Sequence, residues 1–362
     1  MVFSDLEGPW VKADHAFDAV SKAVPGGARL FSILSSYDDY RFFVEHAEGY
    51  EPGDTLKLIA PFLLVYGVDD AFLRTIANLP SNTSIIPEAR EAIRHIKEYQ
   101  CFYLISTSYE QYVERAASLL GVEVQKAYST HFPIDGYRDS LRKDDLALVK
   151  DWASRILQMP LIETDQSGEL SGSSLEAKGE LDRFFWEILP TTSFRTLMEE
   201  LEPVGGSRKF RALEEALEAE GKGISSAMVV GDSITDSVML ERTRDAGGLA
   251  VSFNGNRYSI FNSNAAIISS NCWPTAALSE VFQVSGLRGV EESAGIWDAS
   301  RLSDLESSGL IGEDLYAAMG DAQDGSSPPE VHWLEAVDVD RVVEESEDFR
   351  KRVRGEEIGS LG

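Results

Sequence analysis

Short, continuously apolar segments recur along the chain, and each ends in a cluster of polar residues. They lie at residues 2–3, 102–105, 227–230, 249–253 and 265–268. These segments do not alternate apolar and polar residues in the way that a strand with one wet face does. The pattern therefore predicts strands of a parallel sheet that helices cover on both faces.

Helical spacing occurs between these segments. Apolar residues recur every three or four positions over residues 109–120, and Gly121 follows them as an expected helix end. A second stripe covers residues 210–217, with Ser207 as its expected N-cap and Gly221 at its end. Strands that alternate with helices predict an α/β fold with a doubly wound, Rossmann-like parallel sheet.

These elements account for only part of the 362 residues, so we expect insertions in the core. The predicted core comprises residues 1–12 and 86–283. A mostly helical cap, residues 13–85, interrupts it after the first strand, and a second helical insert covers about residues 138–206. Residues 284–362 are expected to form an acidic C-terminal extension.

Two segments inside these regions are rich in Gly, Ser or Pro. Residues 164–179 are predicted to be an exposed connector, and residues 325–329 a linker that precedes a final charged helix.

The chain carries 61 acidic residues against 33 Lys and Arg, a net charge of −28. So acidic a surface argues against non-specific nucleic-acid binding and against docking on an anionic membrane. The most apolar run, residues 56–68, is shorter than the ~20 residues that span a membrane and contains Pro61. We expect Cys101 and Cys272 to be reduced and see no signal peptide, so the sequence predicts a soluble cytoplasmic protein.

Candidate chemistry lies where the predicted strands end, because the carboxyl ends of parallel strands form one ligand-binding edge. Asp5, Glu7 and Gly8 follow the first strand. Asp5 can serve as a nucleophile or a Mg²⁺ ligand, and Glu7 as a general acid and base. Gly8 permits a sharp turn whose amides face an anion. An acidic turn is the alternative for this segment alone.

A hydroxyl and an ammonium group occupy two further positions of this kind. Ser106 ends the second strand, where it can bond a phosphoryl oxygen beside a helix N-terminus or serve only as a helix cap. Lys209 lies in the first turn of a predicted helix, where the helix dipole disfavours a cation. A nearby anion would offset that cost, and a solvated surface lysine is the alternative.

The most specific segment, Gly-Asp-Ser-Ile-Thr-Asp, begins at Gly231. Its Asp232 and Asp236 lie four residues apart where a loop enters a helix. Carboxylate oxygens are the ligands that Mg²⁺ prefers, so the pair predicts a magnesium site. A helix N-terminus with favourable acids is the alternative.

Taken in order, these four segments resemble the motifs of the haloacid dehalogenase (HAD) superfamily. The spacing from Lys209 to Asp232 resembles its phosphoserine-phosphatase-like members. Further segments look like an uncharacterised archaeal HAD family, some members of which are labelled as an energy-converting hydrogenase subunit. These segments are residues 5–10, 36–40, 48–50, 55–58, 105–109 and 253–256. The resemblance covers about residues 1–280.

The resemblance implies a magnesium-dependent phosphatase of a small phosphomonoester. Asp5 would attack phosphorus to form an aspartyl-phosphate, and Glu7 would protonate the leaving oxygen and then deprotonate water. The superfamily usually has Asp at the position of Glu7. Ser106 would bond the phosphoryl group, and Lys209 would hold its charge and that of Asp5.

The cation and substrate ligands follow from the same resemblance. Mg²⁺ would be bound by Asp5, Asp232, Asp236 and position Glu7, through its backbone carbonyl. Asp14 lies where phosphoserine phosphatases read a substrate amine, and Lys57 lies near their carboxylate-reading arginine. The remaining candidates for substrate binding lie in the matching motifs and are Gly8, Thr107 and Asn254.

Two other functions stay open. The Asp-Leu-Glu-Gly string also occurs in a bacterial phosphoserine phosphatase that transfers phosphate to homoserine, so a phosphotransferase with an alcohol acceptor is one alternative. A non-catalytic partner of a larger, hydrogenase-type complex is the other. The expected ligand is a small phosphorylated metabolite, with no nucleic acid and no membrane insertion, and a protein partner remains an alternative.

Overall fold

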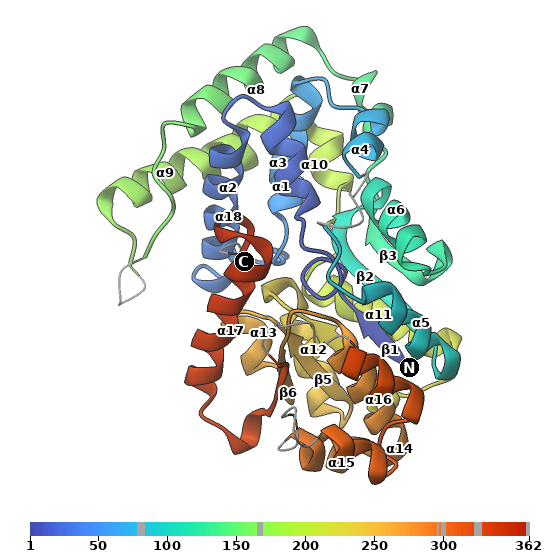
Figure 1. Ribbon diagram of the computed structural model, residues 1–362. Coiled ribbons are helices and arrows are strands. Elements are labelled where there is room, and N and C mark those ends of the chain that lie inside the picture. Colours follow the sequence, from blue (N-terminus) through green and yellow to red (C-terminus); the bar gives the residue numbers. More distant parts are fainter. Residues whose placement is uncertain (78–83, 165–168, 295–296, 298–301, 322–327, 360–362) are drawn as a thin grey trace.

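A single sheet organises the computed structural model, which describes residues 1–77, 84–164, 169–294, 297, 302–321 and 328–359 (Figure 1). Within these residues the sheet has seven strands in the order β3-β2-β1-β4-β5-β6-β7. All neighbouring strands are parallel except β6 and β7. The strands are β1 (Val2–Ser4), β2 (Phe102–Tyr109), β3 (Ala127–Thr130), β4 (Met228–Gly231), β5 (Leu249–Phe253), β6 (Ala265–Ile268) and β7 (Glu330–Trp333).

Helices cover both faces of this sheet, as the continuous apolar runs predict. Alternate strand residues belong to separate hydrophobic clusters, with Val2 and Leu104 on one face and Phe3 and Ile105 on the other. The first face packs against α5 (Ala89–Tyr99), α6 (Glu110–Leu120) and α14 (Trp273–Ala294). The second packs against α11 (Ser207–Ala219) and α12 (Ser237–Asp245). The doubly wound α/β fold class is therefore confirmed.

The two helical inserts pack together into one helical body above the carboxyl edge of the sheet (Figure 1). The first insert supplies α1 (His15–Ala23), α2 (Gly27–Phe43), α3 (Thr55–Val65) and α4 (Asp70–Ile76). The second supplies α7 (Ile134–Arg138), α8 (Lys143–Ile156), α9 (Gly172–Asp182) and α10 (Arg195–Glu200). Phe62 of α3 contacts Phe184, which follows α9, with ring centroids 5.9 Å apart. Short helical turns complete the chain: η1 (Val124–Lys126), η2 (Arg183–Ile188), η3 (Leu189–Thr191), η4 (Ile224–Ser226), η5 (Ile234–Asp236) and η6 (Leu334–Ala336).

The prediction of an exposed connector at residues 164–179 is wrong for the second half of this segment. Residues 165–168 lie outside the described residues, but α9 begins at Gly172. Ser171 caps this helix by accepting a hydrogen bond from the Ser174 amide at 3.2 Å. The helix forms because Ala177 and Leu181 pack into the helical body, a contact that its Gly- and Ser-rich composition does not reveal.

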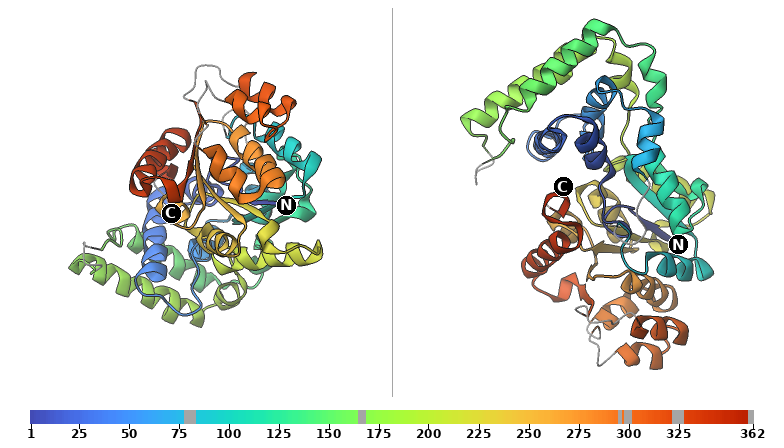
Figure 2. Two further views of the ribbon diagram at one scale, coloured as in Figure 1. Left: turned by 90° about the horizontal axis from the view of Figure 1, so that it is seen from below. Right: turned by 45° about the horizontal axis from the view of Figure 1, so that its top comes forward.

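The C-terminal region packs onto the core and extends the sheet. It contains α15 (Leu302–Ser307), α16 (Glu313–Asp321), α17 (Val339–Arg354) and α18 (Glu356–Gly359). Strand β7 pairs with β6, and α17 packs beside α13 (Arg257–Phe261) before the chain reaches the helical body (Figures 1 and 2). Most of the linker expected at residues 325–329 lies outside the described residues. Across the described ranges, we find no helix with the length and apolar character needed to cross a membrane.

Candidate functional site

Asp5 follows the carboxyl end of β1, an inner strand of the sheet. Its backbone amide donates to the Val230 carbonyl at 2.9 Å, which continues the pairing with β4. Its carboxylate accepts from the Leu6 amide at 2.7 Å through Oδ1. Through Oδ2 it lies 2.9 Å from the Lys209 ammonium. The strand therefore fixes a buried carboxylate at the ligand-binding edge.

Lys209 lies in the first turn of α11, and its side chain is fully buried. It is therefore not the solvated surface lysine that was the alternative. Its Nζ lies between Asp5 Oδ2, at 2.9 Å, and Asp236 Oδ1, at 2.7 Å. Burial alone would lower the pKa of Lys209, but Asp236 and Asp5 outweigh it and raise that pKa above its ordinary value. Two carboxylates, those of Asp5 and Asp236, therefore supply the negative charge that offsets the cost of a lysine in the first turn of a helix.

The loop after β4 brings in the other two carboxylates. Asp236 Oδ2 accepts from the amides of Asp232, at 2.9 Å, and Ser233, at 3.1 Å. Because its Oδ1 binds Lys209, both oxygens of Asp236 hold protein groups. Gly8 has a φ of +100°, and a Cβ atom there would lie 2.1 Å from Asp232 Oδ2, so a glycine is required beside this carboxylate.

Asp5, Asp232 and Asp236 offer oxygens that lie within 4.8 Å of one another. Hard carboxylate oxygens at this spacing fit Mg²⁺. A cation bound here would share these carboxylates with protein groups, because Asp5 and Asp236 contact Lys209 and backbone amides and Asp232 Oδ2 contacts two arginines. Burial raises the pKa of Asp5 to about 7 against the opposing effect of Lys209, and Asp236 and Asp232 add to the rise. A bound cation would counter that effect.

Glu7 faces the same cavity from the turn after β1. Its Oε1 accepts from the His15 amide at 2.8 Å, and its Oε2 accepts from the Ser108 hydroxyl at 2.8 Å. Burial, followed by the charge of Asp14, raises the pKa of Glu7 well above its ordinary value. Asp14 caps α1 by accepting from the Phe17 amide at 2.8 Å, and it also lines the cavity. Glu7 is therefore held in place and biased toward the protonated form.

Three hydroxyl residues lie near the end of β2, and the first of them, Ser106, is not among the residues that line the cavity. The Ser106 hydroxyl is buried and accepts from the Ser108 amide at 3.2 Å. Thr107 and Ser108 line the cavity. Thr107 Oγ1 is buried, and no residue in the described part of the chain offers it a hydrogen-bond partner. A ligand oxygen could supply the missing partner.

A cavity of about 110 Å³ lies where three parts of the chain meet. The core contributes Asp5, Glu7 and Asp232 to its wall. The helical body contributes Asp14, Phe31, Asp38, Asp39, Gly53 and Thr55. The C-terminal helices contribute Arg350, Arg354 and Ile358. The sequence-predicted residues Asp5, Glu7, Asp14, Thr107 and Asp232 are thus brought together around one space, and Asp5 is linked through Lys209 to Asp236.

Gly8 and Ser106 do not line this cavity, and two further candidate residues, Asn254 and Lys57, have their neighbours elsewhere. Asn254 uses both atoms of its side-chain amide on Ser269: Nδ2 donates to the carbonyl at 2.7 Å and Oδ1 accepts from the amide at 2.9 Å. Lys57 lies on α3, where its charged neighbours are Asp54, Arg208 and Glu202. Neither side chain is among the residues that line the cavity.

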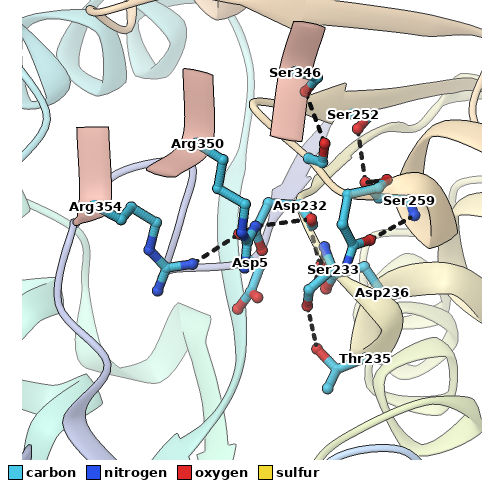
Figure 3. Close-up of polar contacts among 12 residues, drawn as sticks. Asp5, Asp232, Ser233, Thr235, Asp236, Ser252, Ser259, Ser346, Arg350 and Arg354 are labelled. Atoms are coloured by element: carbon cyan, nitrogen blue, oxygen red, sulfur yellow. Dashed lines mark hydrogen bonds and ion pairs between the residues drawn. The ribbon is translucent and has the colours of Figure 1, made fainter. Parts of the chain in front are cut away.

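Arg350 and Arg354 are site residues that the sequence analysis missed. Both guanidinium groups bind Asp232 Oδ2, that of Arg354 at 3.0 Å, and Figure 3 shows them pointing from α17 toward this carboxylate. Val342, Ser346 and Arg350 are buried on α17 at intervals of four residues, and Arg354 continues that row. A charged pair that extends the buried stripe of an amphipathic helix was the available signal.

These contacts define an α/β protein with a buried cluster of carboxylates and basic groups at the ligand-binding edge of its sheet. The chain is similar over its full length to the solved structure of gene product AF1437 from Archaeoglobus fulgidus. The identity is 29%, the TM-score is 0.78, and the match covers 100% of this chain and 98% of the other. The shared architecture therefore includes the helical inserts and the C-terminal region.

A second solved structure, a HAD family hydrolase (t0658) from Salmonella enterica subsp. enterica serovar Typhi, is much less similar. The match covers 71% of this chain and 62% of the other at 10% identity, with a TM-score of 0.41. No family model and no curated protein matches the chain.

Proposed function

We propose that this protein is a magnesium-dependent phosphohydrolase of the HAD type, which cleaves a small phosphomonoester through an aspartyl-phosphate on Asp5. The observation that carries the proposal is the position of the Asp5 carboxylate, 2.9 Å from the buried Lys209 ammonium and clustered with Asp232 and Asp236. The order of these residues along the chain supports the same proposal, since it resembles the HAD motifs.

In the first half-reaction, a carboxylate oxygen of Asp5 attacks phosphorus as the ester P–O bond breaks. Glu7 gives its proton to the leaving alkoxide, a role that suits a carboxyl group whose pKa is raised by burial. Lys209 holds the Asp5 carboxylate in position and balances its charge. Ser106 and Thr107 offer hydroxyl groups to the phosphoryl oxygens.

In the second half-reaction, water attacks the phosphorus of the aspartyl-phosphate. Glu7, now deprotonated, takes the proton from that water, and the P–O bond to Asp5 breaks to release phosphate. Its hydrogen bonds to the His15 amide and the Ser108 hydroxyl keep its carboxyl group oriented through both steps.

Energetics explain why cationic groups are required. Phosphomonoester hydrolysis needs accelerations that approach ~10²¹-fold, whereas general acid–base catalysis supplies ~10²–10⁴-fold. Preorganised positive charge around the phosphoryl oxygens must supply much of the rest. Mg²⁺ bound by Asp5 and Asp232 would neutralise charge on the phosphoryl group. A cavity of about 110 Å³ favours a small phosphorylated metabolite over a macromolecular substrate.

The test is phosphate release from a panel of small phosphomonoesters with Mg²⁺, comparing the wild type with Asp5→Asn. We expect release by the wild type and its loss in Asp5→Asn, because an amide cannot form the aspartyl-phosphate. A parallel series with added alcohols separates hydrolysis from phosphotransfer, because a transferase gives a new phosphate ester in place of free phosphate. A wild type that neither hydrolyses nor transfers across the panel would contradict the proposal and favour a non-catalytic partner protein.

A further inference from the structure

We propose that Arg350 and Arg354 form an anion-binding pair for the phosphoryl group of the substrate, with Asp232 as their partner when no substrate is present. The inference rests on the proposed function and adds to it a pair of substrate ligands from the C-terminal helix. It assigns a role to a part of the chain, α17, that the HAD resemblance does not explain.

The positions of both arginines place them at the candidate site. They line the cavity together with Asp5 and Thr107. Asp232, which they bind, lies so close to Asp5 that the ligand oxygens of the two carboxylates are within 4.8 Å of each other. A phosphoryl group held by Asp5 would therefore lie within reach of the guanidinium groups.

The balance of charge around Asp5 also favours an anionic ligand. Asp5, Asp232 and Asp236 face three basic groups: Lys209, Arg350 and Arg354. These six groups balance when each carries its ordinary charge, and Glu7 and Asp14, which line the same cavity, add negative charge when they are ionised. A divalent cation bound to Asp232 would compete with the two guanidinium groups for this carboxylate and add two positive charges, which favours a ligand such as a phosphomonoester, a dianion above its second pKa of about 6.

The chemistry of the guanidinium group points to the same ligand. Guanidinium stays charged and presents a planar fork of N–H donors that matches phosphate oxygens. In the structure Nη1 of each arginine contacts Asp232 Oδ2, and the two groups also donate to the backbone carbonyls of Asp232, Lys12 and Ala13. A phosphoryl oxygen could therefore replace Asp232 Oδ2 as the acceptor of both Nη1 atoms while the contacts to these carbonyls are kept.

Arg350 donates to the Asp232 carbonyl at 3.0 Å and Arg354 to the Lys12 carbonyl at 3.1 Å, but other contacts also attach α17 to the core. Ser346 donates to the Gly255 carbonyl at 2.7 Å, and the Arg257 amide donates to Glu347 at 3.0 Å. Val342 and Val343 pack against the sheet. Figure 3 shows Ser346 anchored on the core side while both arginines point toward Asp232.

The experiment uses the full chain with Mn²⁺ and inorganic phosphate as probes. Mn²⁺ binding is measured by electron paramagnetic resonance, and phosphate binding to the Mn²⁺-loaded protein by calorimetry. The main variant is Arg354→Gln, because Arg354 lies in the last turn of α17 and is less buried than Arg350. Arg350→Lys is the second variant. Arg352→Gln is the matched control. Arg352 is exposed on the same helix, and its replacement removes the same charge.

We expect Arg354→Gln to weaken phosphate binding roughly tenfold or more, as the loss of a charge-assisted contact requires, while Mn²⁺ binding without phosphate is retained or tightened. Arg350→Lys should weaken phosphate binding in the same direction, and Arg352→Gln should match the wild type. Unchanged phosphate affinity in Arg354→Gln overturns the inference. A parallel loss of Mn²⁺ affinity also overturns it, because the arginine would then serve the fold of the cation site.

The two proposals can fail separately. A wild type that binds phosphate through Arg354 but turns over no phosphomonoester contradicts the proposed function and leaves the anion-binding pair intact. A wild type that hydrolyses phosphomonoesters while Arg354→Gln binds phosphate normally contradicts only the inference. Absence of phosphate binding to the Mn²⁺-loaded wild type overturns the inference outright.

Discussion

Lys209 illustrates at the scale of one residue how this protein keeps charge in its interior. A buried, unpaired ammonium group would cost several kcal/mol. Here Nζ contacts Asp5 and Asp236, and Asp236 is in turn held by two backbone amides. Each member of the cluster thus fixes the next, so the groups are oriented before any ligand arrives. Preorganisation of this kind is what electrostatic catalysis needs.

Replacement of Glu7 by Gln tests the proposed proton transfer. Gln keeps the shape of the side chain and an acceptor for the His15 amide, but it cannot give or take the proton. We expect kcat for the best phosphomonoester to fall by roughly 10²–10⁴-fold. Circular dichroism should show the same fold and a similar melting temperature. Glu7→Asp, which retains an ionisable group, should keep more activity than Glu7→Gln, and an unchanged kcat in Glu7→Gln would contradict the assigned role.

Asp38 makes stability depend on pH. It is buried, and its Oδ2 accepts from the Thr55 hydroxyl at 2.7 Å and from the Gly53 amide at 3.1 Å. Burial, followed by the charges of Asp54 and Asp39, raises the pKa of Asp38 from 3.8 to about 8. Between these two values the folded state keeps a proton that the unfolded chain has lost. The contribution of Asp38 to stability therefore falls as pH rises through this window, and the loss is complete above about pH 8.

Asp38→Asn should remove this dependence, because the amide is neutral at every pH. We expect the free energy of unfolding of the variant, relative to the wild type, to rise by roughly 1–3 kcal/mol between pH 5 and pH 8. Urea denaturation at both pH values measures it. Asp139→Asn, a change at an exposed acid of the same charge, serves as the control and should show no such rise. An Asp38→Asn difference that is the same at both pH values would contradict the assignment.

At the scale of elements, α11 depends on a residue from the helical body. Glu51 accepts hydrogen bonds from the Ser207 amide, at 3.0 Å, and from the Ser207 hydroxyl. Ser207, expected from the sequence to be the N-cap, is instead the first helical residue, and Gly206 is the N-cap. A carboxylate at this end of the helix also interacts favourably with the helix dipole. This interaction offsets part of the cost of Lys209 in the first turn.

We expect Glu51→Ala to lower the free energy of unfolding by about 1–2 kcal/mol, the usual cost of losing a helix cap. It should also lower phosphatase activity, since the first turn that it caps carries Lys209. Urea denaturation and steady-state kinetics measure the two effects. Glu48→Ala, at an exposed acid in the same segment, should behave as the wild type. A free energy of unfolding in Glu51→Ala equal to that of the wild type would show that this cap does not stabilise the protein.

The same contact shows what the sequence can and cannot predict. Strands such as β4 and the helix α6 follow from local apolar patterns, and Asp5, Lys209 and Asp232 follow from their positions at strand and helix ends. Glu51 is 156 residues from Ser207, and Arg354 is 122 residues from Asp232. No local pattern links such partners, because their proximity results from the packing of whole elements. For the same reason the sequence does not predict that two separate inserts form one helical body.

At the scale of the whole molecule, the cavity joins three parts of the chain. The core, the helical body and the C-terminal helices each contribute part of its wall. The net charge of −28 is spread over the same molecule, yet the Debye length at physiological salt is about 8 Å, so the local balance of Asp232 with Arg350 and Arg354 dominates at the site. A ligand held among these groups stabilises all three parts together.

Mg²⁺ should therefore raise the melting temperature of the entire protein as one transition. Binding to the folded state alone contributes about 2.7 kcal/mol at a free concentration one hundred times Kd, which corresponds to a rise of a few degrees. Differential scanning calorimetry with MgCl₂ or EDTA measures it. NaCl at matched ionic strength is the essential control, because screening alone relieves repulsion in a chain of charge −28. Asp232→Asn should lose the Mg²⁺-specific part of the rise while keeping the NaCl response, since it removes a buried cation ligand and leaves the charged surface unchanged. Equal shifts in MgCl₂ and NaCl for the wild type would mean that the carboxylate cluster binds no cation.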